Sequence, residues 1–150
     1  MIVRWFMFIV FILLFSGEIT FGACTVSTNP VSFGSYDVFS PSPTDASGTI
    51  TFTCNTNERV TVSIGQSPNS GGFHPRKMRL SGGTDQLDYN LYTDAACTSV
   101  WGDGTSGTDT ITRRVQKNQP NTLTVYGRIH PRQDVSWGSY TETLTVTITW

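Results

Sequence analysis

The last segment of this 150-residue chain alternates apolar and threonine side chains up to its final residue. In an extended strand Leu144, Val146, Ile148 and Trp150 fall on one side, and the threonines between them fall on the other. This period of two predicts one β-strand from Tyr140 to Trp150, with one buried face and one solvated face. From Leu144 onward the segment has neither a charge nor a proline, the features that normally blunt an exposed edge strand. We therefore expect a further strand, from this chain or from another, to cover its edge.

The same alternation recurs along the chain, and no stretch of ten residues after the first 22 shows a helical stripe. It predicts strands over Thr49 to Cys54, Arg59 to Gly65, Leu87 to Tyr92 and Leu123 to Ile129. The spacers are rich in Gly, Pro, Ser and Asn, which form turns. Short strands at this spacing indicate an all-β protein, an antiparallel β-sandwich rather than alternating βα units.

The N-terminus has the pattern of a secretory signal peptide. An apolar run from Trp5 to Phe15 follows one arginine, and it is shorter than the roughly 20 residues that a spanning helix needs. The small residues Thr20 and Gly22 fit the third-last and last positions before a cleavage point. We therefore expect residues 1–22 to be removed and residues 23–150 to form one exported domain, with no membrane segment left.

A second interpretation of the cleavage region remains open. The sequence Phe21-Gly22-Ala23-Cys24 loosely resembles a lipoprotein box, in which cleavage would fall before Cys24. The lipoprotein box normally has an aliphatic residue where Phe21 stands, so cleavage before Ala23 is the favoured interpretation.

The charge of the chain is close to neutral. It has 10 basic and 11 acidic residues, a formal net charge of −1. The only local basic clusters are Arg76-Lys77-Arg79 and Arg113-Arg114, and neither is long enough to indicate nucleic-acid binding. Both are expected to be solvated strand ends or loops.

Three cysteines fit an oxidising compartment. Cys24 and Cys54 each lie in a predicted strand, and a bridge between them would tie the N-terminus of the mature chain to the core. Cys97 is then left as a buried thiol or an intermolecular partner, and a Cys54–Cys97 pairing stays open.

The sequence offers no convincing enzyme site and no cofactor motif. His74 and His130 each precede a proline, so both are expected in turns, and neither has a catalytic partner nearby in the sequence. Asp103 with Ser106 and Asp109 faintly suggests a calcium loop but lacks the ligand spacing of an EF-hand. A turn with a solvated carboxylate is the better interpretation, and no metal is expected.

Several aromatic residues are candidates for adhesion to sugars or apolar surfaces. Trp101 and Trp137 lie beside glycines, and Tyr36, Phe39 and Phe73 lie near loops rich in Pro or Gly. The favoured alternative is that Trp101 and Trp137 close the two ends of the core, because a sandwich of this size needs large core residues.

An ordered set of motifs spans essentially the whole predicted mature chain. It comprises Cys24-Thr-Val-Ser, Phe33-Gly-Ser-Tyr36, Gly48-Thr-Ile-Thr-Phe-Thr-Cys54, Leu87-Asp-Tyr-Asn-Leu-Tyr-Thr-Asp94, Val100-Trp-Gly-Asp-Gly104 and the closing segment Gly138 to Trp150. In this set the chain resembles a spore coat protein U domain, a family that includes subunits of archaic, Csu-type chaperone/usher pili. The resemblance implies an immunoglobulin-like sandwich that lacks its final strand and is completed by a strand from a neighbouring subunit.

The resemblance also implies partners and a location. A periplasmic chaperone lends a strand during export, an outer-membrane usher assembles the subunits, and the product is a fimbria at the cell surface involved in adhesion or biofilm. The chaperone or donor strand would contact Leu144, Val146, Ile148 and Trp150. The alternative is a self-complete secreted β-sandwich that binds a carbohydrate or a matrix.

The predicted mature N-terminus bears on the position in a fibre. A shaft subunit needs roughly ten alternating residues before its first cysteine to fill its neighbour's core. Only Ala23 stands between the predicted cleavage point and Cys24. We therefore expect a subunit that accepts a strand without giving one: it would cap an assembly, lie at a tip or stay a single secreted subunit.

Overall fold

The computed structural model describes residues 22–150, so the predicted signal peptide lies outside the described residues except for Gly22. Residues 22–150 form nine strands, and no helix among them is long and apolar enough to cross a membrane. The strands are β1 (Cys24–Asn29), β2 (Thr44–Cys54), β3 (Glu58–Ile64), β4 (Arg76–Leu80), β5 (Gln86–Tyr92), β6 (Ile111–Val115), β7 (Asn121–Ile129), β8 (Tyr140–Thr141) and β9 (Val146–Thr149). The expected all-β class is confirmed.

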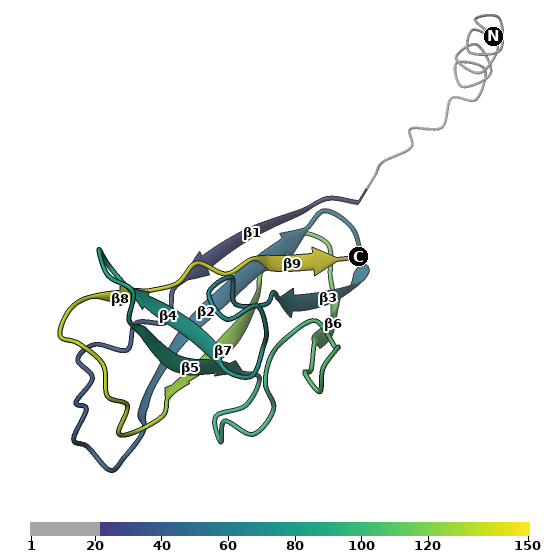
Figure 1. The fold of residues 1–150 in the computed structure, drawn as a ribbon. Coiled ribbons are helices and arrows are strands. Elements are labelled where there is room, and N and C mark those ends of the chain that lie inside the picture. Colours follow the sequence, from purple (N-terminus) through teal and green to yellow (C-terminus); the bar gives the residue numbers. More distant parts are fainter. Residues whose placement is uncertain (1–21) are drawn as a thin grey trace, which may run out of the picture.

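Two antiparallel sheets enclose one core (Figure 1). The large sheet has the order β1-β2-β7-β5-β4-β8, and the small sheet has the order β6-β3-β9. The strands predicted from alternation correspond to β2, β3, β5 and β7. The sequence analysis missed β4 and β6, because most of their residues are cationic or polar and alternation is not visible in them.

The core consists of the inward faces of the alternating strands. In β3 Val60, Val62 and Ile64 are at most 2% exposed, and the residues between them are partly solvated. Trp101 is 0% exposed and donates its indole N–H to the carbonyl of Val62 at 3.1 Å. Burying each aliphatic side chain contributes about 1.5–3 kcal/mol, so these contacts hold the two sheets together.

The C-terminal segment is not the single strand that its sequence predicted. Its first part, β8, pairs with β4 in the large sheet, and its second part, β9, pairs with β3 in the small sheet. Residues 142–145 between them belong to neither ladder as strand residues. The alternation continues through this break, because an extended chain that passes from one sheet to the other keeps its apolar side chains toward the shared core.

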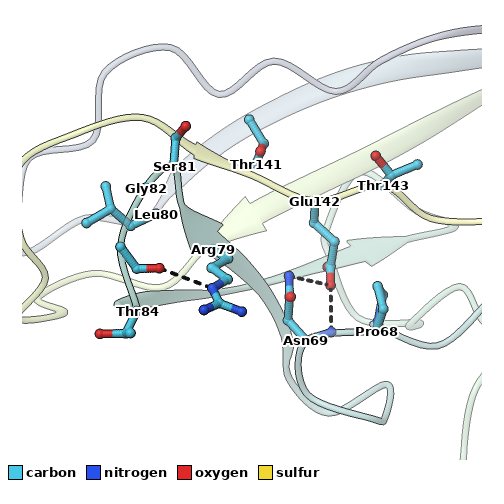
Figure 2. Close-up of a pocket in the computed structure, with 11 residues that line it drawn as sticks. Pro68, Asn69, Arg79, Leu80, Ser81, Gly82, Thr84, Thr141, Glu142 and Thr143 are labelled. Carbon is cyan, nitrogen blue, oxygen red and sulfur yellow. Dashed lines mark hydrogen bonds between the residues drawn. The ribbon is translucent and has the colours of Figure 1, made fainter.

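Glu142 fixes the point where the chain changes sheets. Its Oε1 accepts hydrogen bonds from the Ser67 hydroxyl and from the side-chain amide of Asn69 at 3.2 Å, and its Oε2 accepts one from the Tyr89 hydroxyl at 2.6 Å. Figure 2 shows Glu142 beside Asn69 in a shallow pocket. Burial, together with the bond to Glu142, holds the pKa of Tyr89 well above its ordinary value, so the phenol stays a donor.

Replacing this carboxylate should destabilise the domain. In Glu142→Ala the buried hydroxyls of Ser67 and Tyr89 lose their acceptor, and we expect a loss of about 3 kcal/mol in the free energy of unfolding. The measurement is urea unfolding of the exported chain. The wild type and every variant are compared either all without a bound partner protein or all with the same one. The control is Thr143→Ala at an exposed neighbouring position, which should change the free energy by about 0.5 kcal/mol or less. Equal losses in both variants would contradict the role given to Glu142.

Cys24 and Cys54 face each other across the β1–β2 ladder and form a disulfide, as the sequence predicted. The alternative Cys54–Cys97 pairing is wrong in this structure, where Cys97 has a free thiol. Cys97 is half-buried in a turn, with its backbone amide bonded to the carbonyl of Asp94. The bridge therefore closes the end of the large sheet where β1 begins and β2 ends.

We expect the double variant Cys24→Ala/Cys54→Ala to lose about 3–4 kcal/mol of stability, because a closed loop of 30 residues no longer restricts the unfolded chain. The free energy of unfolding, measured by urea titration in one partner state, tests this. Cys97→Ala serves as the matched control and should have little effect. A stable double variant would show that the bridge is dispensable.

Candidate functional site

The two ends of the described chain form a pair of edges without a strand between them. Within residues 22–150, β1 pairs only with β2 and β9 pairs only with β3. The indole N–H of Trp150 donates to the carbonyl of Gly22 at 2.9 Å, so the end of β9 lies beside the start of β1 (Figure 1). We call the two edges, residues 24–29 and 144–150, the seam.

The inward-facing side chains of β9 are covered incompletely. Val146 and Ile148 stand opposite Ile64 and Val62 of β3, so they face the core. Val62 is 0% exposed, whereas Leu144, Val146 and Ile148 are only half-buried and Trp150 is 51% exposed. The four residues selected from the sequence therefore share one face, and that face lacks a neighbour on one side.

The β1 edge shows the same deficit. Val26 stands opposite Phe52 in the β1–β2 ladder and so faces inward, yet Val26 is 45% exposed while Phe52 is 1% exposed. The sequence analysis did not select Val26, because it is the one aliphatic residue in β1 and a single residue gives no alternation. With Val26, the seam has apolar side chains on both of its edges.

The seam carries no charged side chain on either strand. β1 has the sequence CTVSTN and β9 has VTIT, so their backbone N–H and C=O groups are flanked by small or neutral side chains. The opposite edge of the small sheet is different, because β6 carries Arg113 and Arg114. Charged side chains discourage pairing with another strand, so the seam is the more receptive of these edges.

Three of the aromatic residues considered for adhesion have structural roles. Trp101 and Phe73 are 0% and 2% exposed, respectively, and lie in the core. The hydroxyl of Tyr36 donates to the carbonyl of His130 and accepts the backbone N–H of Gln133, each at 2.9 Å. These three residues are therefore not free to bind a surface.

Two aromatic residues extend into solvent at one end of the molecule. Trp137 is 98% exposed and Phe39 is 87% exposed, so the expectation that Trp137 closes the core was wrong. Their loops, residues 30–43 and 130–139, both leave the large sheet where Thr44 pairs with Ile129. This end is opposite to the Cys24–Cys54 bridge, because it lies at the other end of β2.

Arg76 is buried, which corrects the expectation of a solvated strand end. Its side chain is 0% exposed and donates to Asn90 Oδ1 and to the carbonyl of Trp101, both at 2.7 Å, and to the carbonyl of Gly65 at 3.0 Å. The guanidinium also lies 5.3 Å from the centre of the Phe73 ring. Burial lowers the pKa of Arg76 from its ordinary value. Arg76 thus joins loops to the core and is not available to a ligand.

The other polar candidates also have local partners. Asp103 Oδ1 accepts two hydrogen bonds from Thr105, one from its backbone N–H at 2.9 Å and one from its side-chain hydroxyl at 2.6 Å. These bonds lower the pKa of Asp103. A ring nitrogen of His74 lies 3.0 Å from the carbonyl of Ser106. In the described part of the chain, no three His, Cys, Asp or Glu side chains are grouped so that they could hold a metal ion.

The fold of this chain is similar to that of a solved pilus subunit. A solved complex of similar fold is the CsuC–CsuE chaperone–tip adhesion subunit pre-assembly complex of the archaic Csu pili of Acinetobacter baumannii. The likeness has a TM-score of 0.59 at 20% identity and covers 87% of this chain but 40% of the solved chain. It confirms the immunoglobulin-like antiparallel sandwich.

Comparison of sequences identifies the family of this chain. Protein U of Myxococcus xanthus is 32% identical over 142 residues, which are 85% of this chain and 78% of that protein. The model of the Spore Coat Protein U domain matches residues 16–147. This chain therefore belongs to the Spore Coat Protein U domain family.

Proposed function

We propose that this chain is an exported, non-catalytic subunit of a fimbria or surface coat, and that it accepts a β-strand from another protein at the seam. The observation that carries the proposal is the exposure of inward-facing apolar side chains on two edges with no strand partner among residues 22–150: 45% for Val26 and 51% for Trp150. Membership of the Spore Coat Protein U domain family supports it.

The energetics of strand addition favour such an acceptor. A donor that places four or five apolar side chains against the seam gains on the order of 8–12 kcal/mol, at about 2 kcal/mol each. The uncharged edges of β1 and β9 offer a ladder of backbone hydrogen bonds in addition. Without a donor, part of the core faces water, so the isolated domain is expected to be marginally stable or to aggregate.

The proposed partners are a periplasmic chaperone during export, an outer-membrane usher, and a neighbouring subunit in the final assembly. The solved complex of similar fold joins a chaperone to a tip adhesion subunit. In this chain the contacts to the donated strand are assigned to Leu144, Val146, Ile148 and Trp150. The route implies passage through the periplasm and display at the cell surface.

Processing of the leader fits this scheme. Gly22 is the last residue of the predicted signal peptide, and its carbonyl accepts the hydrogen bond from Trp150. Cleavage after Gly22 would remove this acceptor. The Trp150 side chain, at the end of the exposed apolar face, would then be free to contact a donated strand.

A matched pair of variants tests the seam. Ile148 faces inward and Thr147 faces outward one residue earlier, so Ile148→Asp places a charge in the seam and Thr147→Asp places it in solvent. The chain is exported with its own leader and mixed with a ten-residue donor peptide of alternating apolar residues, and thermal unfolding is recorded. We expect the peptide to raise the melting temperature of the wild type and of Thr147→Asp. Ile148→Asp should bind it at least about tenfold more weakly, because about 2 kcal/mol of burial is lost.

A peptide with the same composition but no alternation is the second control and should have no effect. If the wild-type chain unfolds cooperatively alone and ignores the donor peptide, the proposal is wrong. The self-complete secreted sandwich that binds carbohydrate or matrix would then replace it.

A second function, surface adhesion, is proposed for the end that carries Phe39 and Trp137. These side chains are 87% and 98% exposed, and an exposed aromatic ring offers apolar surface that a sugar or an apolar surface can cover. Their loops are held in place, since Tyr36 bonds to His130 and the amide of Ser136 donates to Asp85 at 2.9 Å. These bonds tie both loops to the rest of the domain, at the end away from the terminal end of the seam.

We expect Phe39→Ser/Trp137→Ser to reduce attachment of cells that display the assembled protein by at least about tenfold while leaving surface display unchanged, because each aromatic contact is worth about 1 kcal/mol or more. Attachment to glycan-coated and to apolar surfaces, counted against display measured with an antibody, provides the data. Val38→Ser in the same loop is the control, since Val38 is partly covered. Unchanged attachment by the double variant would rule out adhesion through this end.

A further inference from the structure

Two arginines of the small sheet stand directly opposite each other. Arg59 of β3 pairs with Arg114 of β6 in the antiparallel ladder. Arg59 lies next to the fully buried Val60, so its side chain and that of Arg114 are on the outer, solvated face. Directly opposed positions have Cβ atoms about 4.5–5.5 Å apart, and like charges there destabilise a sheet.

No carboxylate in the described part of the chain forms an ion pair with either arginine. The ion pairs found among residues 22–150 join Lys77 to Asp88 and Arg128 to Asp45. Glu58 precedes Arg59 and therefore points to the other face of β3, where its carboxylate accepts the Thr56 hydroxyl at 3.0 Å. The two guanidinium groups are left to solvent and to external ligands.

The pair lies in a hollow of about 710 Å³ at the end of the small sheet. We call it the basic hollow; its polar and charged lining is Asn57, Glu58, Arg59, Arg114, Gln116, Lys117 and Gln119, so three cations face one carboxylate. Lys117 adds a third cation, and its backbone N–H donates to Asn57 Oδ1 at 2.8 Å. The adjacent backbone N–H of Asn118 donates to the carbonyl of Cys54 at 2.8 Å. The turn that carries Lys117 is therefore fixed to the disulfide-bonded end of β2, in the large sheet.

The chemistry of the basic hollow selects its ligand. Arginine forks bind carboxylate and sulfate groups through paired N–H donors. The side-chain amides of Gln116 and Gln119 are exposed and suit the hydroxyl groups of sugars. The apolar lining residue, Val115, is 4% exposed, so the hollow lacks the apolar centre typical of protein–protein interfaces.

We propose that the basic hollow binds an acidic polysaccharide through carboxylate or sulfate groups held between Arg59 and Arg114. This site is distinct from the seam, because Arg59 and Arg114 lie on β3 and β6 and not on β1 or β9. The opposed arginines lower the stability of the free domain and become favourable when an anion lies between them.

The test uses the exported full chain, with the wild type and all variants either free of a donated strand or bound to the same one. It measures binding to alginate (carboxylated), dextran sulfate (sulfated) and dextran (neutral). The variants are Arg59→Gln and Arg114→Gln, singly and together. Arg113→Gln is the matched control, since Arg113 is adjacent in sequence but lies opposite Val60 on the other face of β6. We expect an affinity for one or both acidic polymers that falls at least tenfold in the double variant and less than twofold in Arg113→Gln, and no binding of dextran.

Thermal unfolding separates binding from folding. Because like charges are removed, the double variant should melt at the same temperature as the wild type or higher, and only the wild type should be stabilised by the acidic polymer. Binding to alginate alone or to dextran sulfate alone supports the site and identifies the acid group. Failure of both acidic polymers to bind at low salt, or an equal loss in Arg113→Gln and the double variant, would overturn the proposal.

Discussion

Backbone N–H and C=O groups must be hydrogen-bonded where water is excluded, and this requirement governs the architecture of the domain. Within each of the two sheets the backbone groups bond to the neighbouring strands, whereas the outer N–H and C=O groups of the edge strands have no strand partner among the described residues. At β6 the open edge is protected by arginines, whereas at β1 and β9 it is bordered by Thr, Ser and apolar side chains. The same two strands carry inward-facing residues that are incompletely covered, so unpaired backbone and uncovered core coincide at the seam.

Buried polar side chains determine the path of the chain between the sheets, which the apolar core alone does not specify. The inward faces of β2, β3, β5 and β7 hold the sheets together, but they do not determine where the chain leaves one sheet for the other. Glu142 fixes that point through Ser67, Asn69 and Tyr89, and Arg76 fixes the carbonyl groups of the neighbouring loops. Among the described residues no buried side-chain polar atom lacks a partner, which is the condition for such polar groups to stabilise rather than disrupt a core.

The sequence predicted the parts of the fold that depend on period-two alternation, and these include the disulfide-bonded strand and the apolar face of β9. It could not predict β4 or β6, because Arg76 and the arginines of β6 interrupt the alternation. It also could not distinguish Trp101 from Trp137, since both follow the same local pattern of an aromatic residue beside glycine. Only tertiary contacts separate them: Trp101 reaches the carbonyl of Val62, whereas Trp137 lies in a loop outside the core.

The domain separates its surfaces by location. The start of β1 and the end of β9 lie toward one end, and the loops before β2 and after β7 lie at the other (Figure 1). The disulfide and the basic hollow belong to the first end, and Phe39 and Trp137 belong to the loops at the second. An added strand at the seam would complete the core along its side and leave these aromatic loops uncovered. Because β2 spans the distance between the ends as one strand of 11 residues, the aromatic loops are supported by a rigid element that begins beside them and ends at the disulfide. Under the proposed function, assembly and surface contact use separate surfaces of one small domain.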